Sequence, residues 1–382
     1  MIYFDNAATT WPKPREVLRA VEDAIKNHGS NPGRSGHRMA LAAARLVYES
    51  RELIAEFFNA ESPDNIVFTL NATDAINMAL KGVLEPGDHV ITTSMEHNSV
   101  SRPLFALRGK GVEWDVVKCG RDGSLDPRDI EKAIKPNTRL IAVTHASNVT
   151  GTIMPVEEVG KLAREKGILF LVDASQSAGV LPIDVREMNI DLLAFSGHKG
   201  LYGPQGTGGL YVRKGVDVRP LREGGTGSFS DELAQPQLLP DRLESGTLNT
   251  PGIAGLAAGV RFIKEKGIES IREREVKLTR RFLDGLQEME GIEVYGPAEP
   301  GRRCAVVPIN LKGMDSSELA YILDSAFGIE VRAGLHCSPM AHNTLGTADR
   351  GAARFSFSVF NTAEEIDEAL KALQSIAENF RT

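Results

Sequence analysis

The chain of 382 residues has few cysteines, two tryptophans and no long hydrophobic run. Its cysteines, Cys119, Cys304 and Cys337, are far apart and form no CxxC pair, so their spacing predicts neither a zinc nor an iron–sulfur site, and no metal is expected. No apolar stretch approaches the ~20 residues of a membrane span, and the first residues do not read as a signal segment. We therefore expect a cytoplasmic protein without a membrane partner or a disulfide framework.

Basic residues do not outnumber acidic ones. The sequence has 44 basic and 51 acidic residues, a net charge of -7, which argues against nucleic acid or an anionic membrane as the main partner. With 42% hydrophobic and 25% charged residues, the composition is ordinary for a globular protein, and the length allows two domains. Small soluble ligands are the expected partners.

The order of apolar segments predicts an α/β fold. Between residues 66 and 213, short apolar runs alternate with helical segments, which predicts a mostly parallel sheet covered on both faces. The seven expected strands are 66–69, 89–93, 112–118, 140–144, 168–172, 192–196 and 209–212. After about residue 251, one long helical stretch over 253–290 precedes strands at 292–295, 305–310, 329–332 and 354–359 and a last helix with a capping box at Thr362 and Glu365. We read this part as a smaller α+β domain.

A lysine follows one of the expected strands. The apolar run 191–195 leads into Ser196, Gly197, His198 and Lys199, and open α/β sheets bind ligands beyond the carboxyl ends of their strands. A partly desolvated lysine there loses proton affinity and can form a Schiff base with a carbonyl cofactor. The alternative is a solvated loop lysine, the usual case. The donors of Ser196 and His198 beside Lys199 favour the functional role, and pyridoxal 5′-phosphate is the expected carbonyl cofactor.

Polar residues at other strand ends fit the same cofactor. Ala72 and Thr73 open a helix after the first strand, where free N–H groups favour a phosphate, although Thr73 could be a simple N-cap. His97 follows the second strand and could cover a flat ring and transfer protons, or be a capping residue. Asn148 follows the fourth strand and could hydrogen-bond an oxygen at the ring edge, or be a turn residue.

The fifth strand ends in a carboxylate. Asp173 comes directly after the apolar run 168–172 and is followed three residues later by Gln176. A buried carboxylate needs a cation, and a protonated pyridine nitrogen supplies one while keeping the ring able to accept electrons. The alternative is again a helix N-cap.

The motif Ser196-Gly197-His198-Lys199, with Asp173-Ala174-Ser175-Gln176 upstream, resembles the fold-type I pyridoxal phosphate enzymes of aminotransferase class V, and among them the cysteine desulfurases. The resemblance extends from Asp5-Asn6-Ala7-Ala8 to Asn361-Thr362. It implies a large cofactor-binding domain at 15–255 and a small domain formed by 1–14 and 256–382. It also implies that Lys199 forms the Schiff base, Asp173 pairs with the pyridine nitrogen, and His97 stacks on the ring as a catalytic residue. Gln176 and Asn148 would lie near the phenolic oxygen, with Asn148 also binding the substrate. The resemblance places Ala72, Thr73, Ser196 and His198 at the phosphate.

Two further segments resemble the parts of this family that cross a dimer interface. The segment 244–250, which contains Thr247, looks like the piece that reaches the phosphate of the neighbouring subunit. The segment 31–37 resembles the one that approaches the partner's substrate, with Arg34 as its basic residue. The resemblance therefore implies a homodimer with shared active sites.

The C-terminal part holds two candidates for substrate chemistry. Arg354 lies on an apolar strand, where its guanidinium could bind the carboxylate of an amino acid through two parallel hydrogen bonds. Cys337 lies in a turn between Gly334 and Pro339, with Arg332 and His336 near enough in sequence to favour a thiolate. A free cysteine is otherwise most often a buried, inert residue.

The sequence Arg332-Ala333-Gly334-Leu335-His336-Cys337 also resembles the persulfide-forming loop of the Suf-type, group II desulfurases. The implied activity converts L-cysteine or selenocysteine to alanine and passes sulfur through Cys337 to an acceptor protein, as in iron–sulfur cluster assembly. Leu335, Gly33 and the loop 224–230, for which both a mobile and an ordered state remain open, depart from that group. A transaminase, a selenocysteine lyase, an epimerase or a cofactor-binding protein without turnover are the alternatives.

Overall fold

The computed structural model describes residues 1–33 and 35–380 and contains a central seven-stranded sheet. The strand order is β2-β8-β7-β6-β5-β3-β4, and β8 is the strand that runs antiparallel to its neighbours. The bounds are β2 (Ile66–Thr69), β3 (His89–Thr93), β4 (Glu113–Val117), β5 (Thr138–Thr144), β6 (Leu169–Asp173), β7 (Leu192–Ser196) and β8 (Gly208–Val212). The prediction of an α/β fold with a mostly parallel sheet is confirmed.

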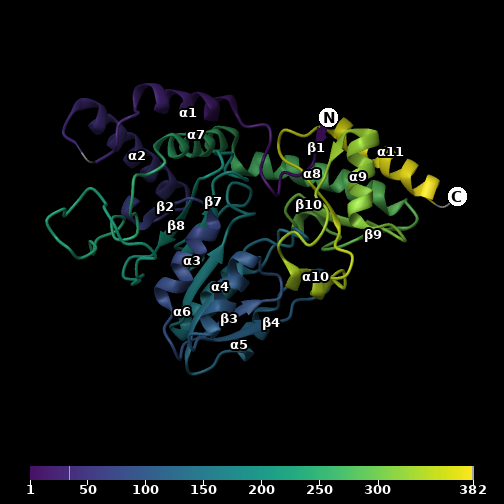
Figure 1. Cartoon of the computed structure of the whole chain (residues 1–382). Helices are drawn as coiled ribbons and strands as arrows, with labels where there is room; N and C mark the ends of the chain where they lie inside the picture. The colour runs from purple at the N-terminus through teal and green to yellow at the C-terminus, as the bar shows by residue number, and fades with distance from the viewer. Residues whose placement is uncertain (34, 381–382) are drawn as a thin grey trace.

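Helices cover both faces of this sheet (Figure 1). Alternate residues of a strand point to opposite faces, and in β5 Ile141 and Val143 join one core while Leu140 and Ala142 join the other. The helices are α3 (Ala72–Val83) and α4 (Asn98–Arg108) on the second of these cores, and α2 (Arg38–Phe57), α6 (Val156–Lys166) and α7 (Thr250–Lys266) on the first, with the short α5 (Pro127–Lys132) beside α6. Residues in the central strands are therefore buried on both sides, as their apolar sequences require.

The expected single helix over 253–290 is in fact two helices. Helix α7 ends at Lys266, and α8 (Ile268–Gln287) begins after Gly267, whose φ of +81° is a backbone conformation that other residues rarely adopt. Helix α7 packs against α1 (Arg15–Asn27) and α2. The expected domain boundary at residue 255 falls within α7, where Ile253 and Leu256 belong to the same core. We therefore propose that the division lies at Gly267 instead.

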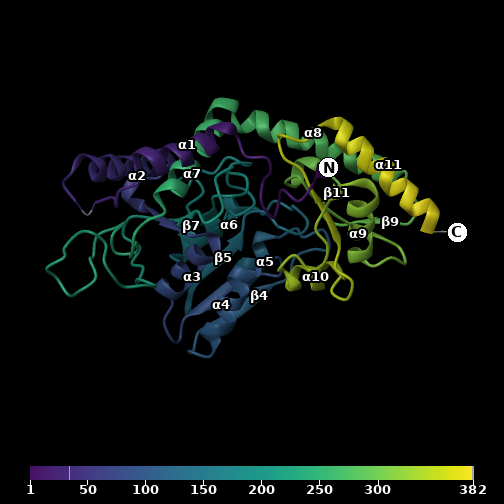
Figure 2. The ribbon, with the colours of Figure 1, turned by 45° about the horizontal axis from the view of Figure 1, so that its top comes forward.

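The C-terminal part is an α+β unit beside the large sheet. An antiparallel sheet is formed by β9 (Ile292–Val294), β10 (Val306–Leu311) and β12 (Ala353–Ser356), and β1 (Ile2–Tyr3) pairs in parallel with β11 (Ile329–Glu330). The remaining elements are α9 (Ser316–Phe327), α10 (Pro339–Leu345), α11 (Ala363–Phe380) and the 3₁₀ turns η1 (Pro63–Asn65) and η2 (Pro300–Arg302). Figure 2 shows α8 running from the large sheet toward α11. The expected capping box is present, since Thr362 and Glu365 exchange hydrogen bonds at the start of α11.

Residues 1–33 and 35–380 hold neither a membrane-spanning helix nor a metal-binding cluster. No helix in these ranges combines the length and the apolar character needed to cross a bilayer. The same ranges hold no group of three or more histidine, cysteine, aspartate or glutamate side chains that could bind a metal ion.

Candidate active site

A cavity of about 480 Å³, open solvent at its mouth included, lies beyond the carboxyl ends of β3, β5, β6 and β7. Most of the residues predicted to bind the cofactor line it. They are Ala72, Thr73, His97, Asn148, Asp173, Gln176, Ser196, His198 and Lys199, joined by Asn71, Ser99, Thr144, Ala146 and Ser175. Strand ends that are distant in sequence thus meet at one place, as parallel strands require.

Lys199 is partly buried and lies in the wall of this cavity. Burial is the main reason why its pKa falls from 10.5 to about 8, with Arg354 and Arg332 lowering it further and Asp173 opposing the change. Among the described residues its amine forms no ion pair. The amine is therefore close to neutral under mildly basic conditions and is available as a nucleophile or a base.

The backbone around Lys199 is held by the segment 5–13, which we call the N-terminal strap. The N–H of Thr10 donates to the His198 carbonyl at 3.1 Å, and its hydroxyl donates to the Lys199 carbonyl at 2.9 Å. The ammonium of Lys13 donates to the same His198 carbonyl at 2.6 Å. The strap therefore fixes the position from which the Lys199 side chain extends.

Asp173 is a buried carboxylate at the end of β6. It is 4% exposed, and its Oδ1 accepts a hydrogen bond from the Ser175 N–H at 2.9 Å. Within residues 1–33 and 35–380 no lysine, arginine or histidine pairs with it. Since a buried carboxylate needs a cation, a ligand that brings a protonated ring nitrogen fits this position, which is an argument for pyridoxal phosphate from the site itself.

His97 begins α4 and is held in one tautomer. Its Nδ1 accepts the Ser99 N–H at 3.0 Å, so the proton of the neutral ring is on Nε2. Burial, with Lys199 as the next cause, lowers its pKa to about 4. The Ser99 hydroxyl lies 2.7 Å from that of Thr73 and so links His97 to α3. A neutral imidazole in this wall is suited to cover a flat ring.

The start of α3 suits a phosphate. Asn71 caps the helix by accepting the Asp74 N–H at 2.9 Å, and Ala72 and Thr73 are the next residues, whose N–H groups have no partner inside the helix. His198 lines the same end, and its Nδ1 is buried without a hydrogen-bond partner in the described part of the chain. Burial lowers its pKa to about 4. Free donors thus gather where the resemblance implies the phosphate.

Asn148 has a role that the sequence does not reveal. Its Nδ2 donates to the His336 carbonyl at 2.7 Å, and its Oδ1 accepts from the Ser338 hydroxyl at 2.7 Å. Its amide therefore braces the loop that carries Cys337 against the cavity wall. Gln176, the other residue expected at the ring edge, donates from Nε2 to the Ala7 carbonyl of the strap at 3.0 Å.

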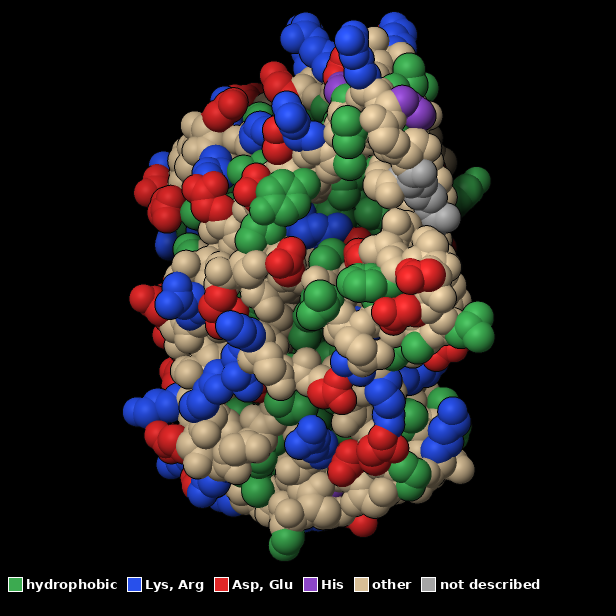
Figure 3. Space-filling view, turned by 90° about the vertical axis from the view of Figure 1, so that its left-hand side faces the viewer, with side chains coloured by type: hydrophobic (Ala, Val, Ile, Leu, Met, Phe, Trp, Pro, Cys, Tyr) green, Lys and Arg blue, Asp and Glu red, His purple; other side chains and the backbone are tan. Residues whose placement is uncertain are grey.

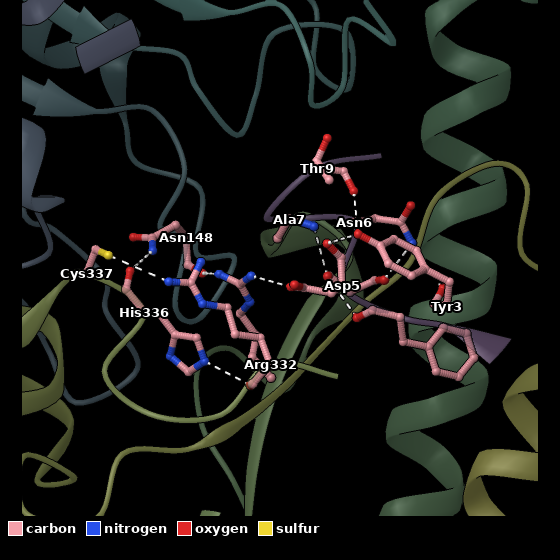
Figure 4. Close-up of polar contacts among 12 residues, drawn as sticks. Tyr3, Asp5, Asn6, Ala7, Thr9, Asn148, Arg332, His336 and Cys337 are labelled. Carbon is pink, nitrogen blue, oxygen red and sulfur yellow. Dashed lines mark hydrogen bonds and ion pairs between the residues drawn. The ribbon is translucent and has the colours of Figure 1, made fainter. Parts of the chain in front are cut away.

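Cys337 lies exposed on this loop, next to a guanidinium. The Nη2 of Arg332 is 3.6 Å from its Sγ (Figure 4). The Asn98 N–H donates to the Cys337 carbonyl at 2.8 Å. His336 and Cys337 have φ of +51° and +57°, an uncommon conformation outside glycine that the surrounding hydrogen bonds maintain. The loop is thus built to hold the thiol at a defined place.

The expectation that His336 helps to charge the thiol is wrong. Its imidazole is directed away from Cys337 (Figure 4), and its Nδ1 lies 3.2 Å from Nε2 of the buried His342. Burial lowers the pKa of His336 to about 2, so the ring is neutral. Arg332 is therefore the cation at the thiol. Burial instead raises the pKa of Cys119 to about 11 and that of Cys304 to about 12, so neither ionises readily.

Arg354 is buried and is hydrogen-bonded to the backbone of Asn148, which lines the cavity. Its Nη1 donates to the Asn148 carbonyl at 2.9 Å, and its Nη2 donates to Asp5 Oδ1 at 2.7 Å. Its Nε is buried and has no partner among the described residues. Sequence analysis missed Asp5, Lys13 and Ser338 as parts of the site, because only long-range hydrogen bonds reveal them.

Thr247 lies apart from the cavity. It lines a different hollow, together with Leu70 and Arg222, and its hydroxyl accepts a hydrogen bond from Asn31 Nδ2 at 3.3 Å. The two segments expected to cross an interface are thus in contact with each other. Arg34 lies outside the described residues.

The chain matches the family model described as aminotransferase class-V over residues 2–369. It is 39% identical to a probable cysteine desulfurase of Methanothermobacter thermautotrophicus, over 98% of this chain and 94% of the relative. It is 33% identical to a cysteine desulfurase of Haloferax volcanii, over 100% of this chain and 90% of the relative.

Solved structures of cysteine desulfurases are also similar to this chain. The apo structure of a cysteine desulfurase from Thermococcus onnurineus is 37% identical and superposes with a TM-score of 0.93, with 99% of this chain and 95% of that chain covered. The cysteine desulfurase CsdA from Escherichia coli, in its S-sulfonic acid form, is 28% identical with a TM-score of 0.87, with 98% of this chain and 94% of that chain covered. The chain therefore belongs to the aminotransferase class-V family. Within that family it groups with the cysteine desulfurases.

Proposed function

We propose that this protein is a pyridoxal phosphate-dependent cysteine desulfurase that takes the sulfur of L-cysteine onto Cys337 and releases L-alanine. The observation that carries the proposal is the exposed thiol beside Arg332, on a loop that Asn148 joins to the cavity of Lys199 and Asp173. A transaminase would need the cavity but not the thiol.

The chain's own residues would hold the cofactor. Asp173 would keep its ring nitrogen protonated, His97 would cover the ring, and the start of α3 with Ser196 and His198 would bind the phosphate. When bound, pyridoxal phosphate supplies a carbonyl that takes up the substrate amine and a ring that accepts electrons from its Cα.

Lys199 and Cys337 would then carry out different steps of the reaction. The Lys199 amine, whose pKa is about 8, takes the proton from the substrate Cα. The Cys337 thiolate attacks the substrate sulfur, so that an S–S bond forms and the C–S bond breaks, and its electron pair passes to Cβ, which gains a proton. Return of a proton to Cα then completes alanine, and the persulfide remains on Cys337. Because the loop is exposed, an acceptor protein can reach this sulfur.

We further propose a homodimer. Large hydrophobic side chains are exposed at the end of the molecule formed by α2 and the loops between β8 and α7, and Figure 3 shows hydrophobic side chains mixed with charged ones on this side. They include Met39, Leu41, Tyr48, Phe229 and Leu233. Since Thr247 does not reach the cavity of its own chain, it and Arg34 would serve the partner's site. The Suf-type subgroup, selenocysteine as a second substrate and a cytoplasmic role in iron–sulfur cluster assembly complete the proposal.

The test is to incubate the purified holoenzyme with L-cysteine and dithiothreitol and to measure alanine and sulfide. Cys337→Ala should lose sulfide release by at least about 100-fold while keeping the visible absorbance of the bound cofactor, because the thiol makes the new S–S bond. The matched control, Cys119→Ala, should behave as the wild type. Normal turnover by Cys337→Ala would contradict the proposal, and alanine formation that depends on an added keto acid would indicate a transaminase.

A further inference from the structure

Of the two arginines near the cavity, Arg354 contacts a carboxylate, whereas Arg332 contacts none among the described residues. Arg332 and Arg354 face each other across a backbone bridge, with N–H···O bonds of 3.3 and 2.7 Å in the two directions. Among the described residues, Asp5 is the acidic side chain within 4.0 Å of either guanidinium, through the 2.7 Å contact with Arg354. The pair therefore has capacity for a second carboxylate.

One N–H donor of Arg354 has no acceptor among the described residues. Its two Nη atoms are held by Asp5 and by the Asn148 carbonyl, while its Nε is buried with no partner in the described residues. A guanidinium binds a carboxylate through two parallel N–H groups. The Nε and Nη2 groups of Arg354 form one such pair. While Asp5 is bound, Nη2 has an acceptor and Nε has none among the described residues. An incoming carboxylate would complete this pair by taking the position of the Asp5 oxygen.

Asp5 can give up this contact. Its side chain is 23% exposed, whereas that of Arg354 is 1% exposed, so the aspartate has access to water and the arginine has none. Figure 4 shows the Asp5 carboxylate and the Cys337 sulfur on opposite sides of Arg332. Asp5 also begins the strap whose Thr10 and Lys13 hold the backbone of His198 and Lys199.

We propose that Asp5 is an internal competitor for Arg354, which holds the guanidinium in the ligand-free protein and yields it to the carboxylate of the amino acid substrate. This deepens the proposed function and rests on it, since Arg354 is taken as the arginine that binds the substrate carboxylate. Asp5 keeps a buried cation paired when no substrate is bound. It also weakens binding, because each substrate must displace it. Asp5 is thus a specificity-determining residue that lowers the affinity for amino acids with a free carboxylate and leaves the affinity for amines without a carboxylate unchanged.

The experiment compares the wild-type holoenzyme with Asp5→Asn, and with Asp324→Asn as a control on the exposed face of α9. Each protein is titrated with L-alanine and with L-alaninamide, and dissociation constants are read from the change in visible absorbance, without turnover. Asp5→Asn should bind alanine roughly tenfold more tightly, because the competing charge is gone and the arginine lacks a carboxylate. Binding of alaninamide, and both constants of the control, should not change.

Unchanged or weaker alanine binding by a folded Asp5→Asn protein would overturn the proposal and leave Asp5 as a residue that only orients Arg354. Equal gains for alanine and alaninamide would overturn it as well. If Asp5→Asn does not fold, Asp5→Ser is the second uncharged variant for the same titration.

A parallel measurement on cofactor-free protein uses propionate and propionamide. Propionate should raise the melting temperature of Asp5→Asn more than that of the wild type, and an equal rise would contradict the proposal. Failure of the wild type to release sulfide from cysteine, with this difference intact, would reject the proposed function alone.

Discussion

Lys199 should make the cofactor-free protein less stable at neutral pH than a matched neutral residue would. Its pKa falls from 10.5 to about 8 because it is buried. One pKa unit corresponds to ~1.4 kcal/mol, so the charged amine destabilises the fold by about 3 kcal/mol. The variant Lys199→Met keeps the length of the side chain without its charge. At pH 7 it should raise the free energy of unfolding by up to about 3 kcal/mol.

The difference in the free energy of unfolding between Lys199→Met and the wild type should also depend on pH. Below pH 8 the amine is protonated in both the folded and the unfolded state, so the full cost is present. Between pH 8 and 10.5 the folded protein has lost the proton while the unfolded chain still binds it, so the wild type gains stability as the pH rises and the advantage of Lys199→Met shrinks. Urea unfolding of cofactor-free protein at pH 7 and pH 10.5, followed by tryptophan fluorescence, measures both values.

The control is Lys214→Met at an exposed position, which should change the free energy of unfolding little at either pH. An advantage of Lys199→Met that is the same at both pH values, or absent at pH 7, would refute the burial of a charged amine at this position.

Two further predictions concern the supports of the site. Arg51 and Glu244 form a buried pair with two hydrogen bonds, and Glu244 also accepts the Phe68 N–H at 2.6 Å. Glu244→Gln should lower the free energy of unfolding by about 3 kcal/mol, because it leaves a buried charge unpaired, while the exposed Glu232→Gln should not; equal stabilities in denaturant titrations would contradict this. At Gly259 a Cβ would lie 2.1 Å from the Leu201 carbonyl oxygen, on the loop that follows Lys199. Gly259→Ala should therefore cost about 1–3 kcal/mol and weaken cofactor binding, whereas Gly301→Ala, whose Cβ would meet no atom closer than Glu299 Oε1 at 3.7 Å, should be neutral in both measurements.

The parts of the site that lie at strand ends could be predicted from local sequence. Apolar runs that end in Asp173 or lead to Lys199 define both a strand and the edge at which its last residue lies. Since all parallel strands present their carboxyl ends at one edge, these residues and His97 were expected together, and they line one cavity. The central strands are buried on both faces, so their continuous apolar runs made the sheet predictable as well.

The contacts between distant segments could not be predicted in this way. Arg354 and Asp5 are 349 residues apart, and nothing in the local pattern of either indicates that they pair. The Asn148 amide was expected at the ring edge, and only the folded loop shows that it holds the backbone at His336. The neutral state of His336 could not be predicted either, because it depends on burial and not on the distance in sequence from Cys337. The break at Gly267 was missed because the helical pattern continues on both sides of it.

The most direct test of the cofactor site is borohydride reduction of the holoenzyme followed by peptide mapping. Borohydride fixes the cofactor to the amine that carries it, and the buried Lys199 amine in the cavity wall is the one that the structure makes available. We predict a phosphopyridoxyl group on the peptide that contains Lys199 and on no other. A label on Lys13 or another lysine, or a reduced protein that carries no label, would contradict the assignment of this cavity.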